Sequence, residues 1–404
     1  MRILHVSWEY PPLVYGGLGR HVHGLAEAQA AEGHDVVVIT QRPDGAVDDE
    51  VVDGVRVVRA AYEPARLTES ELLGWVDGLG RALSRTALRT GWAPDVVHAH
   101  DWVVGGAARR LRDGFGVPLV ATLHATEAGR HQGWLPGDLS RGIHRREWRL
   151  TVDARRVIVC SDAMRTDVET LFAVPHGDVD VVPSGVDAAA WRAAPRDVRA
   201  ARERYAGEGP LLVTASRLEW EKGVHTLLDS LPRLRRRFPG LRLVVAGRGS
   251  QHDALVAQAR RLRLGRGAAF VGWLPEPELA ALLGAADAVV LPSVYEPFGL
   301  VALEAAAQRV PLAVSDVGGL AETVVDGVTG RTFPPLDPAG LADVVTEVLS
   351  DHAAAQRRVR AMSRRVTAVH AWPAVARRTV EVYAHAIDDA DAPRPRRRLV
   401  VRDG

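Results

Sequence analysis

The feature that most constrains the fold of this chain is a strand-like run that turns sharply into a helix at residues 288–309. The apolar run 288–292 ends ahead of Pro297 and Gly299, and apolar residues then recur at helical spacing from Leu300. A helix that begins at such a turn points free backbone N–H groups, and the positive end of its dipole, at whatever lies in front of it. The stretch therefore predicts a phosphate site within an α/β fold.

Two carboxylates frame this turn. Glu296 lies within it, and Glu304 lies among alanines on the second turn of the expected helix. Burying a carboxylate costs free energy unless a hydrogen bond compensates for the lost water. The residues alone leave two interpretations open: a helix start whose glutamates are satisfied by the backbone, or a ligand site.

The pattern Glu296-Pro-Phe-Gly-Leu300, followed by Glu304, resembles the signature of glycosyltransferase family 4. Members of that family are retaining enzymes of the GT-B fold that use nucleotide sugars, and they include glycogen synthases. The resemblance implies that Glu296 contacts hydroxyls of the donor sugar and that Glu304 accepts hydrogen bonds from the ribose. It also implies that backbone N–H groups around Phe298, Gly299 and Leu300 hold the diphosphate.

The composition narrows the class of protein. A chain of 404 residues predicts two domains, and a net charge of +1 argues against a nucleic-acid partner. The single cysteine, Cys160, follows an apolar run, so we expect a buried thiol and a reducing, cytoplasmic location. Residues 1–7 read as a first strand, and no run approaches the roughly 20 apolar residues of a membrane span. The basic segment 141–150 is either a solvated helix face or a peripheral contact with anionic lipid or an acidic acceptor.

The chain opens with a strand, a glycine turn, a helix at 18–32 and a second strand at 35–40. The turn Gly16-Gly17-Leu18-Gly19 does not fit the dinucleotide fingerprint Gly-x-Gly-x-x-Gly, and no acidic residue ends the second strand. In the resembled family this loop closes over the donor diphosphate, which implies donor contacts from Gly16, Gly17 and Leu18. Longer starch and glycogen synthases have a lysine just before these glycines, whereas this chain has Val14 and Tyr15, so the nucleotide base stays open.

Two motifs in the first half of the chain have residues that could bind a metal. His98 and His100 share one face of a strand and, with Asp101, form a possible metal site; without a second ligand cluster we predict no metal and no cofactor. The acids of Asp178-Val-Asp180 are expected to face solvent.

The resemblance implies acceptor-side roles for Asp101 and Trp102 and a donor-sugar contact for His124. Trp134, in a glycine-rich loop, is either a stacking surface for an acceptor sugar or a surface residue.

A second doubly wound unit follows the polar stretch 189–209. Arg217 and Lys222 frame one loop after its first strand, and Lys222 is the single lysine beside fifty arginines. A forked guanidinium and a compact ammonium suit a diphosphate leaving group, and the spacing matches the Arg-x4-Lys-Gly of the family. The resemblance adds donor contacts at three later positions, namely Gly247, Trp273 and Leu274.

The predicted architecture is therefore GT-B, two doubly wound Rossmann-like parallel-sheet domains facing a deep cleft. We expect an acceptor-side domain at 1–188, a nucleotide-sugar domain at 189–372, a helix at 373–390 that crosses back, and a basic disordered tail at 391–404. The resemblance covers about residues 1–390, and its motifs occur in both domains in the expected order.

The predicted function is retaining, metal-independent transfer of glucose from ADP- or UDP-glucose to the 4-hydroxyl of an α-1,4-glucan. The motifs, such as Trp8-Glu-Tyr-Pro-Pro12, most resemble those of small glycogen synthase-type glucosyltransferases. Such enzymes act in the synthesis of glycogen or of methylglucose lipopolysaccharide. Arg217, Lys222 and the helix N–H groups would take the charge of the leaving diphosphate, while Glu296 and His124 orient the sugar. Open alternatives are another sugar, a lipid-linked or small-glycoside acceptor, a sugar-nucleotide 2-epimerase, and a non-catalytic sensor. The oligomeric state is left open.

Overall fold

The computed structural model describes residues 1–62 and 69–390 and divides into two compact units. Unit 1 comprises Met1–Gly185 together with the C-terminal segment from Trp372, and unit 2 comprises Val186–Ala371. The sequence predicts these boundaries after residues 188 and 372. The basic tail predicted at 391–404 lies outside the described residues.

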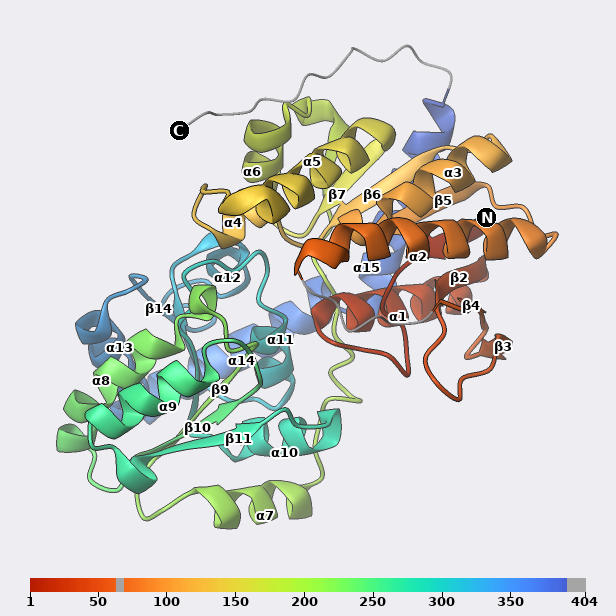
Figure 1. The fold of residues 1–404 in the computed structure, drawn as a ribbon. Helices are drawn as coiled ribbons and strands as arrows, with labels where there is room; N and C mark the ends of the chain where they lie inside the picture. Colours follow the sequence, from red (N-terminus) through yellow and green to blue (C-terminus); the bar gives the residue numbers. More distant parts are fainter. Residues whose placement is uncertain (63–68, 391–404) are drawn as a thin grey trace. The chain divides into compact units, whose positions relative to one another are not determined.

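Unit 1 is built on an eight-stranded sheet of order β3-β4-β2-β1-β5-β6-β7-β8, in which only the β3–β4 pair at the edge is antiparallel (Figure 1). Its parallel strands are rich in valine and buried on both faces, as a sheet covered by helices on each side requires. The strands are β1 (Arg2–Val6), β2 (Asp35–Gln41), β3 (Asp49–Val52), β4 (Val55–Ala60), β5 (Val96–His100), β6 (Leu119–Leu123), β7 (Arg156–Val159) and β8 (Val179–Val181).

The helices of unit 1 include one from the far end of the chain. Helix α15 packs with α1 over the sheet, and its Tyr383 is fully buried in the core formed with Ile3, Leu25 and Val96. The helices are α1 (Gly17–Ala31), α2 (Glu69–Arg89), η1 (Trp102–Val104), α3 (Gly105–Phe115), α4 (Glu127–Arg130), α5 (Gly137–Asp153), α6 (Asp162–Phe172), η2 (His176–Asp178) and α15 (Trp372–Asp388).

Unit 2 has a six-stranded, wholly parallel sheet of order β11-β10-β9-β12-β13-β14. Counted within the unit, this is the doubly wound order 3-2-1-4-5-6, whose direction of winding reverses between β9 and β12. The strands are β9 (Leu211–Ala215), β10 (Arg242–Ala246), β11 (Ala268–Gly272), β12 (Ala288–Leu291), β13 (Leu312–Ser315) and β14 (Arg331–Phe333).

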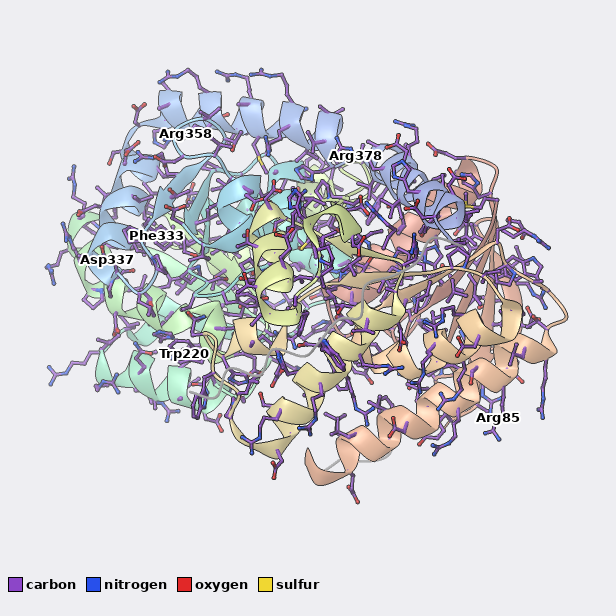
Figure 2. All side chains as sticks on the ribbon, turned by 90° about the horizontal axis from the view of Figure 1, so that it is seen from above. Arg85, Trp220, Phe333, Asp337, Arg358 and Arg378 are labelled. Carbon is purple, nitrogen blue, oxygen red and sulfur yellow. The ribbon has the colours of Figure 1, made fainter. Side chains whose placement is uncertain are left out.

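The helices of unit 2 cover both faces of this sheet (Figure 1). Phe333 at the end of β14 lies in the core, and Asp337 caps α13 by accepting hydrogen bonds from the N–H groups of Ala339 and Gly340 (Figure 2). The helices are α7 (Pro195–Tyr205), η3 (Trp220–Lys222), α8 (Val224–Arg237), α9 (His252–Arg261), η4 (Gly265–Gly267), α10 (Glu276–Ala285), α11 (Leu300–Ala307), α12 (Gly318–Thr323), α13 (Pro338–Ser350) and α14 (His352–Val369).

Two further expectations can be compared with the structure. Cys160 is buried at the end of β7, as predicted for a small hydrophobic side chain. Among the described residues, no helix has the length and apolar character that a membrane span requires.

Candidate active site

The candidate site of unit 2 lies where the winding of its sheet reverses. Arg217 and Lys222 follow β9, and the segment 293–300 follows β12, the neighbouring strand across the reversal. Loops at the carboxyl ends of two such strands diverge and leave a crevice in which doubly wound folds bind ligands. The structure therefore brings together, at the carboxyl ends of these two strands, the residues of unit 2 that the sequence predicts for the donor diphosphate.

The backbone holds Lys222 against the loop after β12. The carbonyl oxygen of Glu221 accepts hydrogen bonds from the N–H groups of Val294 and Tyr295, at 2.8 and 3.2 Å. Gly223 follows with a φ of +65°, and a Cβ atom there would lie 1.9 Å from the carbonyl oxygen of Pro292. Only glycine fits this close approach, so the position of Lys222 is set by its neighbours in the chain.

Lys222 and Glu296 form an ion pair with 2.9 Å between Nζ and Oε2. The exposed fractions of the two side chains are only 13% and 20%, so the pair is less screened by water than an ordinary surface pair. Ser293 Oγ lies 3.4 Å from the same carboxylate oxygen. The carbonyl oxygen of Glu296 accepts a hydrogen bond from Gly319 at 3.0 Å, so the turn after β13 supports this residue from behind.

Helix α11 begins at Leu300, directly after Gly299, as the sequence predicts. Gly299 has a φ of +95°, and no side chain of the described residues caps the helix there, so its first N–H groups face away from the helix. The Phe298 ring is buried edge-on against His370, and its carbonyl oxygen accepts a hydrogen bond from Thr323 Oγ1. Glu304 is buried within α11.

Among the other residues of unit 2 that the sequence predicts to contact the donor, Arg217 and Trp273 are more exposed than the Lys222–Glu296 pair. Arg217 is 51% exposed and pairs with Glu221 at 2.9 Å, a contact that the sequence reasoning missed because a loop gives no spacing signal. Gly247 donates its N–H to the carbonyl oxygen of Gly272, which joins the ends of β10 and β11. Trp273 is 55% exposed and Leu274 half-buried. Beside Lys222, the exposed Trp220 stacks with His225 (Figure 2).

In unit 1, the glycine loop after β1 surrounds a carboxylate that the sequence reasoning missed. Glu9 is buried, and its Oε2 accepts hydrogen bonds from the N–H groups of Tyr15 and Gly16, at 2.8 and 3.1 Å. Burial raises the pKa of Glu9, while these backbone bonds lower it. The N–H of Gly16, expected to face a diphosphate, is thus bonded within the chain. Those of Gly17 and Leu18 lie in the first turn of α1, where a helix has no internal partner for them.

The residues that the sequence predicts to contact the acceptor follow β5 and β6. Asp101 is buried with a φ of +64°, and its Oδ1 accepts a hydrogen bond from the N–H of His124 at 2.8 Å, which ties the ends of the two strands together. Trp102 begins η1 and is half-buried. Trp134 is 66% exposed, so its ring face is open.

Five imidazoles gather at the carboxyl ends of β1, β5 and β6. The rings of His98 and His100 lie 4.1 Å apart, as their shared strand face predicts, and three histidines from other segments join them: His5, His21 and His124. The sequence does not predict this cluster, because it depends on strand register: His5 and His98 pair in register on the adjacent parallel strands β1 and β5.

These imidazoles supply the strongest candidate metal ligands among the described residues. Two triads, His5–His98–His100 and His21–His100–His124, each have one ring nitrogen per residue within 4.8 Å of the others. Both ring nitrogens of His5, His98 and His100 already bond to one another or to nearby side chains, for example His98 to Tyr383 and Thr122. In the triad His5–His98–His100, every ring nitrogen therefore already has a hydrogen-bond partner. The third ligand considered from the sequence, Asp101, points its Oδ1 at a backbone N–H instead.

The predicted solvent exposure of Asp178 and Asp180 is wrong. Both are only partly exposed, and Asp180 accepts two hydrogen bonds from Arg156, each at 2.8 Å. A bidentate arginine–carboxylate pair across adjacent strands β7 and β8 explains the reduced exposure of Asp180.

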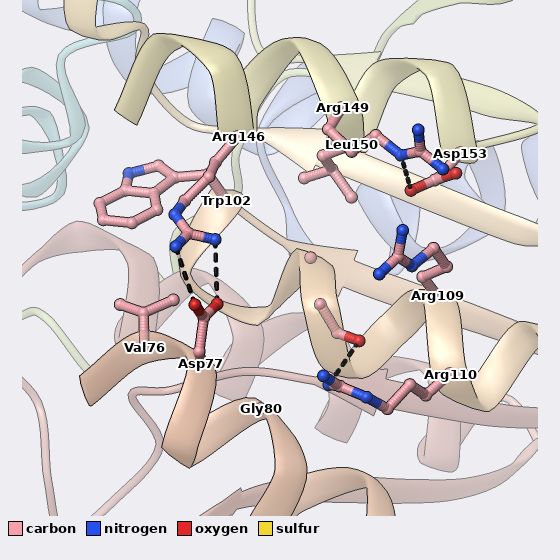
Figure 3. A pocket seen from close by; sticks show the side chains of 12 residues that line it. Val76, Asp77, Gly80, Trp102, Arg109, Arg110, Arg146, Arg149, Leu150 and Asp153 are labelled. Atoms are coloured by element: carbon pink, nitrogen blue, oxygen red, sulfur yellow. Dashed lines mark hydrogen bonds and ion pairs between the residues drawn. The ribbon is translucent and has the colours of Figure 1, made fainter. Parts of the chain in front are cut away.

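A cavity of about 100 Å³ lies between α2, α3 and α5 of unit 1, lined in part by arginines (Figure 3). Arg146 forms two 3.0 Å bonds with Asp77, and Arg149 bonds Asp153 at 3.0 Å. The basic segment 141–150 is therefore tied partly into the fold, which goes beyond the solvated face that the sequence suggested.

Replacing the buried Glu147 with glutamine is expected to remove a pH dependence of stability. Its Oε1 accepts a hydrogen bond from the N–H of Glu127, and burial raises the pKa of Glu147 to about 8. The folded chain thus keeps a proton that the unfolded chain releases above about pH 4.5. Stability from this group is complete below that pH and is lost as the pH rises through 8.

Melting temperatures measured at pH 5.5 and 8.5 test whether Glu147 causes this pH dependence of stability. The wild type should lose roughly 5 °C more than the Glu147→Gln variant between the two values. Glu278→Gln, which removes an exposed carboxylate, serves as the control and should follow the wild type. Equal pH profiles for Glu147→Gln and the wild type would show that Glu147 is charged in the folded chain.

Protein-family models match two successive parts of the chain. A family model described as Glycosyltransferase Family 4 matches residues 15–190, and one described as Glycosyl transferases group 1 matches residues 197–365. A glycogen synthase of Mycobacterium tuberculosis is 48% identical over 415 residues, which cover 99% of this chain and 98% of that protein.

Two solved structures share the fold. Sucrose-phosphate synthase of Thermosynechococcus elongatus aligns with a TM-score of 0.82 and 25% identity, over 96% of this chain and 99% of that one. The catalytic domain of starch synthase IV from Arabidopsis thaliana, bound to ADP and acarbose, aligns with a TM-score of 0.78 and 18% identity, over 96% and 99%. The predicted GT-B fold is confirmed, and from its full-length similarity to a glycogen synthase and its matching family models, the chain belongs to glycosyltransferase family 4.

Proposed function

We propose that this protein transfers glucose from ADP- or UDP-glucose to the 4-hydroxyl of an α-1,4-glucan, with retention and without a metal ion. The observation that carries the proposal is the 48% identity to a glycogen synthase along the whole chain. The arrangement in unit 2 supports it, because the Lys222–Glu296 pair joins the loop after β9 to the loop that precedes α11, at the reversal of the sheet.

The chemical problem is the negative charge that builds on the departing nucleoside diphosphate. Lys222, Arg217 and the first N–H groups of α11 are positive or partly positive groups held by the backbone before the substrate arrives. Fixed charges of this kind stabilise a transition state because they need no reorganisation during the reaction. We assign them the task that a divalent metal performs in other phosphate-transferring sites.

The sugar and the nucleotide are assigned to other groups. Glu296 accepts hydrogen bonds from hydroxyls of the donor sugar, Glu304 accepts them from the ribose, and Trp273 with Leu274 borders the base. In unit 1, His124 contacts the donor sugar, while Asp101, Trp102 and Trp134 contact the acceptor. No carboxylate is assigned as a covalent nucleophile.

Activity with purified protein tests the proposal. Release of nucleoside diphosphate is measured for ADP-glucose and UDP-glucose, each with maltooligosaccharide primers and with small glycosides, and the products are examined by NMR. We expect lengthened primers with α-1,4 linkages. A β-linkage would contradict retention, and product formed only with small glycosides would move the acceptor to that class.

Chelation tests the absence of a metal. We expect excess EDTA to leave the rate of nucleotide release within about twofold, because the stabilising charges belong to the chain. Loss of activity that is restored by Mg²⁺ or Mn²⁺ would contradict the proposal. Incubation with nucleotide sugar alone should leave the sugar configuration unchanged, since an inverted C2 would indicate an epimerase. Tight nucleotide-sugar binding without any turnover would indicate a sensor.

A further inference from the structure

A chain of buried hydrogen bonds ends at His124. Gln29 Oε1 lies 2.7 Å from His5 Nε2, His5 Nδ1 lies 3.0 Å from His100 Nε2, and His100 Nδ1 lies 3.3 Å from His124 Nε2. Gln29, His5 and His100 are each fully buried. The chain therefore connects α1, β1 and β5 to the histidine that follows β6, away from bulk water.

Which atoms donate and which accept along this chain of hydrogen bonds follows from its other end, at Gln29. The side-chain amide nitrogen of Gln29 donates to the Tyr383 hydroxyl at 3.3 Å, so the amide oxygen is the atom that faces His5. A carbonyl oxygen only accepts, so His5 carries its proton on Nε2. A neutral imidazole has one donor and one acceptor, which makes His5 Nδ1 an acceptor for the Nε2–H of His100.

The same alternation of donors and acceptors then determines the tautomer of His124. His100 Nδ1 carries no proton, so it accepts a hydrogen bond from the Nε2–H of His124. His124 Nδ1 is consequently left as a bare acceptor, and no described residue donates a hydrogen bond to it. His5 and His100 are fully buried away from water, which disfavours a charged imidazole, so the alternation is that of neutral rings.

We propose that Gln29, His5 and His100 are positioning residues that hold His124 in the Nε2–H tautomer, so that its Nδ1 accepts a hydrogen bond from a hydroxyl of the donor sugar. The use of this acceptor rests on the proposed function, whereas the tautomer is a property of the free protein. A ring in the opposite tautomer would present a donor to the ligand, and the hydroxyl would have to turn its own proton elsewhere.

Two substitutions at one remote position separate this role from simple packing. Gln29→Leu keeps the size of the side chain but removes the acceptor, and Gln29→Glu keeps the size and retains an acceptor for the Nε2–H of His5. Neither touches His124. Protein labelled with ¹⁵N in the histidine rings is examined without ligand by long-range ¹H–¹⁵N correlation. The His124 signals are assigned by their loss in His124→Asn.

We expect a protonated Nε2 and a bare Nδ1 for His124 in the wild type and in Gln29→Glu, and mixed tautomers in Gln29→Leu. The kcat of glucose transfer should fall about fivefold in Gln29→Leu and recover in Gln29→Glu, with the donor KM changing less. Comparable melting temperatures for the two variants would exclude unfolding as the cause.

Several results would overturn the proposal: a proton on Nδ1 of His124 in the wild type, a Gln29→Leu variant with an unchanged tautomer, or a changed tautomer with unchanged kcat in an active enzyme. If the wild type transfers no glucose from any donor, the proposed function fails. The ring spectra of the free protein still decide whether the hydrogen-bond chain sets the tautomer.

Discussion

Replacing Lys222 with methionine is expected to lower kcat by about 10²- to 10³-fold, the range observed when one fixed stabilising group is removed from an active site. The donor KM should change by less than about fivefold, because the charge that the ammonium stabilises is only partly developed in the bound donor. Steady-state release of nucleoside diphosphate at saturating primer measures both quantities.

The physical reason lies in how Lys222 is held. Its backbone is fixed by the bonds of Glu221 to Val294 and Tyr295, and its ammonium lies 2.9 Å from Glu296 in a partly buried pair. An ammonium so placed moves little between the ground state and the transition state. Methionine keeps the length and apolar stem of lysine but has no charge, so the loss reports electrostatics more than packing.

Two variants serve as controls for Lys222→Met. Arg233→Met also removes one positive charge from unit 2, but Arg233 lies on α8 in an exposed pair with Asp343, so its kcat should match the wild type. Lys222→Arg keeps the charge in a larger, planar group, and we expect only partial recovery. If Arg233→Met were as damaging as Lys222→Met, net charge and not position would be responsible. If Lys222→Met kept full activity, the diphosphate would be stabilised by other groups.

The fold of unit 2 was predictable because its signals are local. Apolar runs such as 288–291 mark parallel strands, and the glycine at 299 marks the turn into α11. The doubly wound order then carries the ends of β9 and β12 to the same crevice, so that Arg217, Lys222 and Glu296 could be grouped from the sequence. What the sequence could not predict was which side chains neutralise these cations. The pairs to Glu221 and Glu296 depend on loop conformations that no periodicity encodes.

Unit 1 shows the opposite case, in which the candidate site depends on contacts between segments that are distant in the sequence. The antiparallel β3 at the sheet edge and the buried Glu147 carry no distinctive spacing. Glu9 lies in a loop, and its bond to Gly16 occupies an N–H that a motif comparison alone leaves for the ligand. The histidine cluster required strand register, because His5, His100 and His124 are far apart in the chain and adjacent only once β1, β5 and β6 are paired.

Replacing Glu296 with glutamine is expected to lower kcat by about 10²-fold, close to the effect of Lys222→Met. Glutamine keeps the size and one oxygen acceptor, so hydroxyls of the donor sugar can still be bonded, but the charge that orients the ammonium is gone. Because Glu296 and Lys222 act as one pair at 2.9 Å, their effects should not add. The double variant Lys222→Met with Glu296→Gln should therefore be little slower than either single variant.

The double variant also separates catalysis from stability. Lys222→Met alone leaves the Glu296 carboxylate, 20% exposed, without its cation, so its melting temperature should fall below that of the double variant. Restored stability without restored activity would place the Lys222–Glu296 pair in the reaction itself. Additive losses in kcat would instead mean that Glu296 and Lys222 act on different parts of the substrate, with Glu296 on the sugar alone and Lys222 on the diphosphate alone.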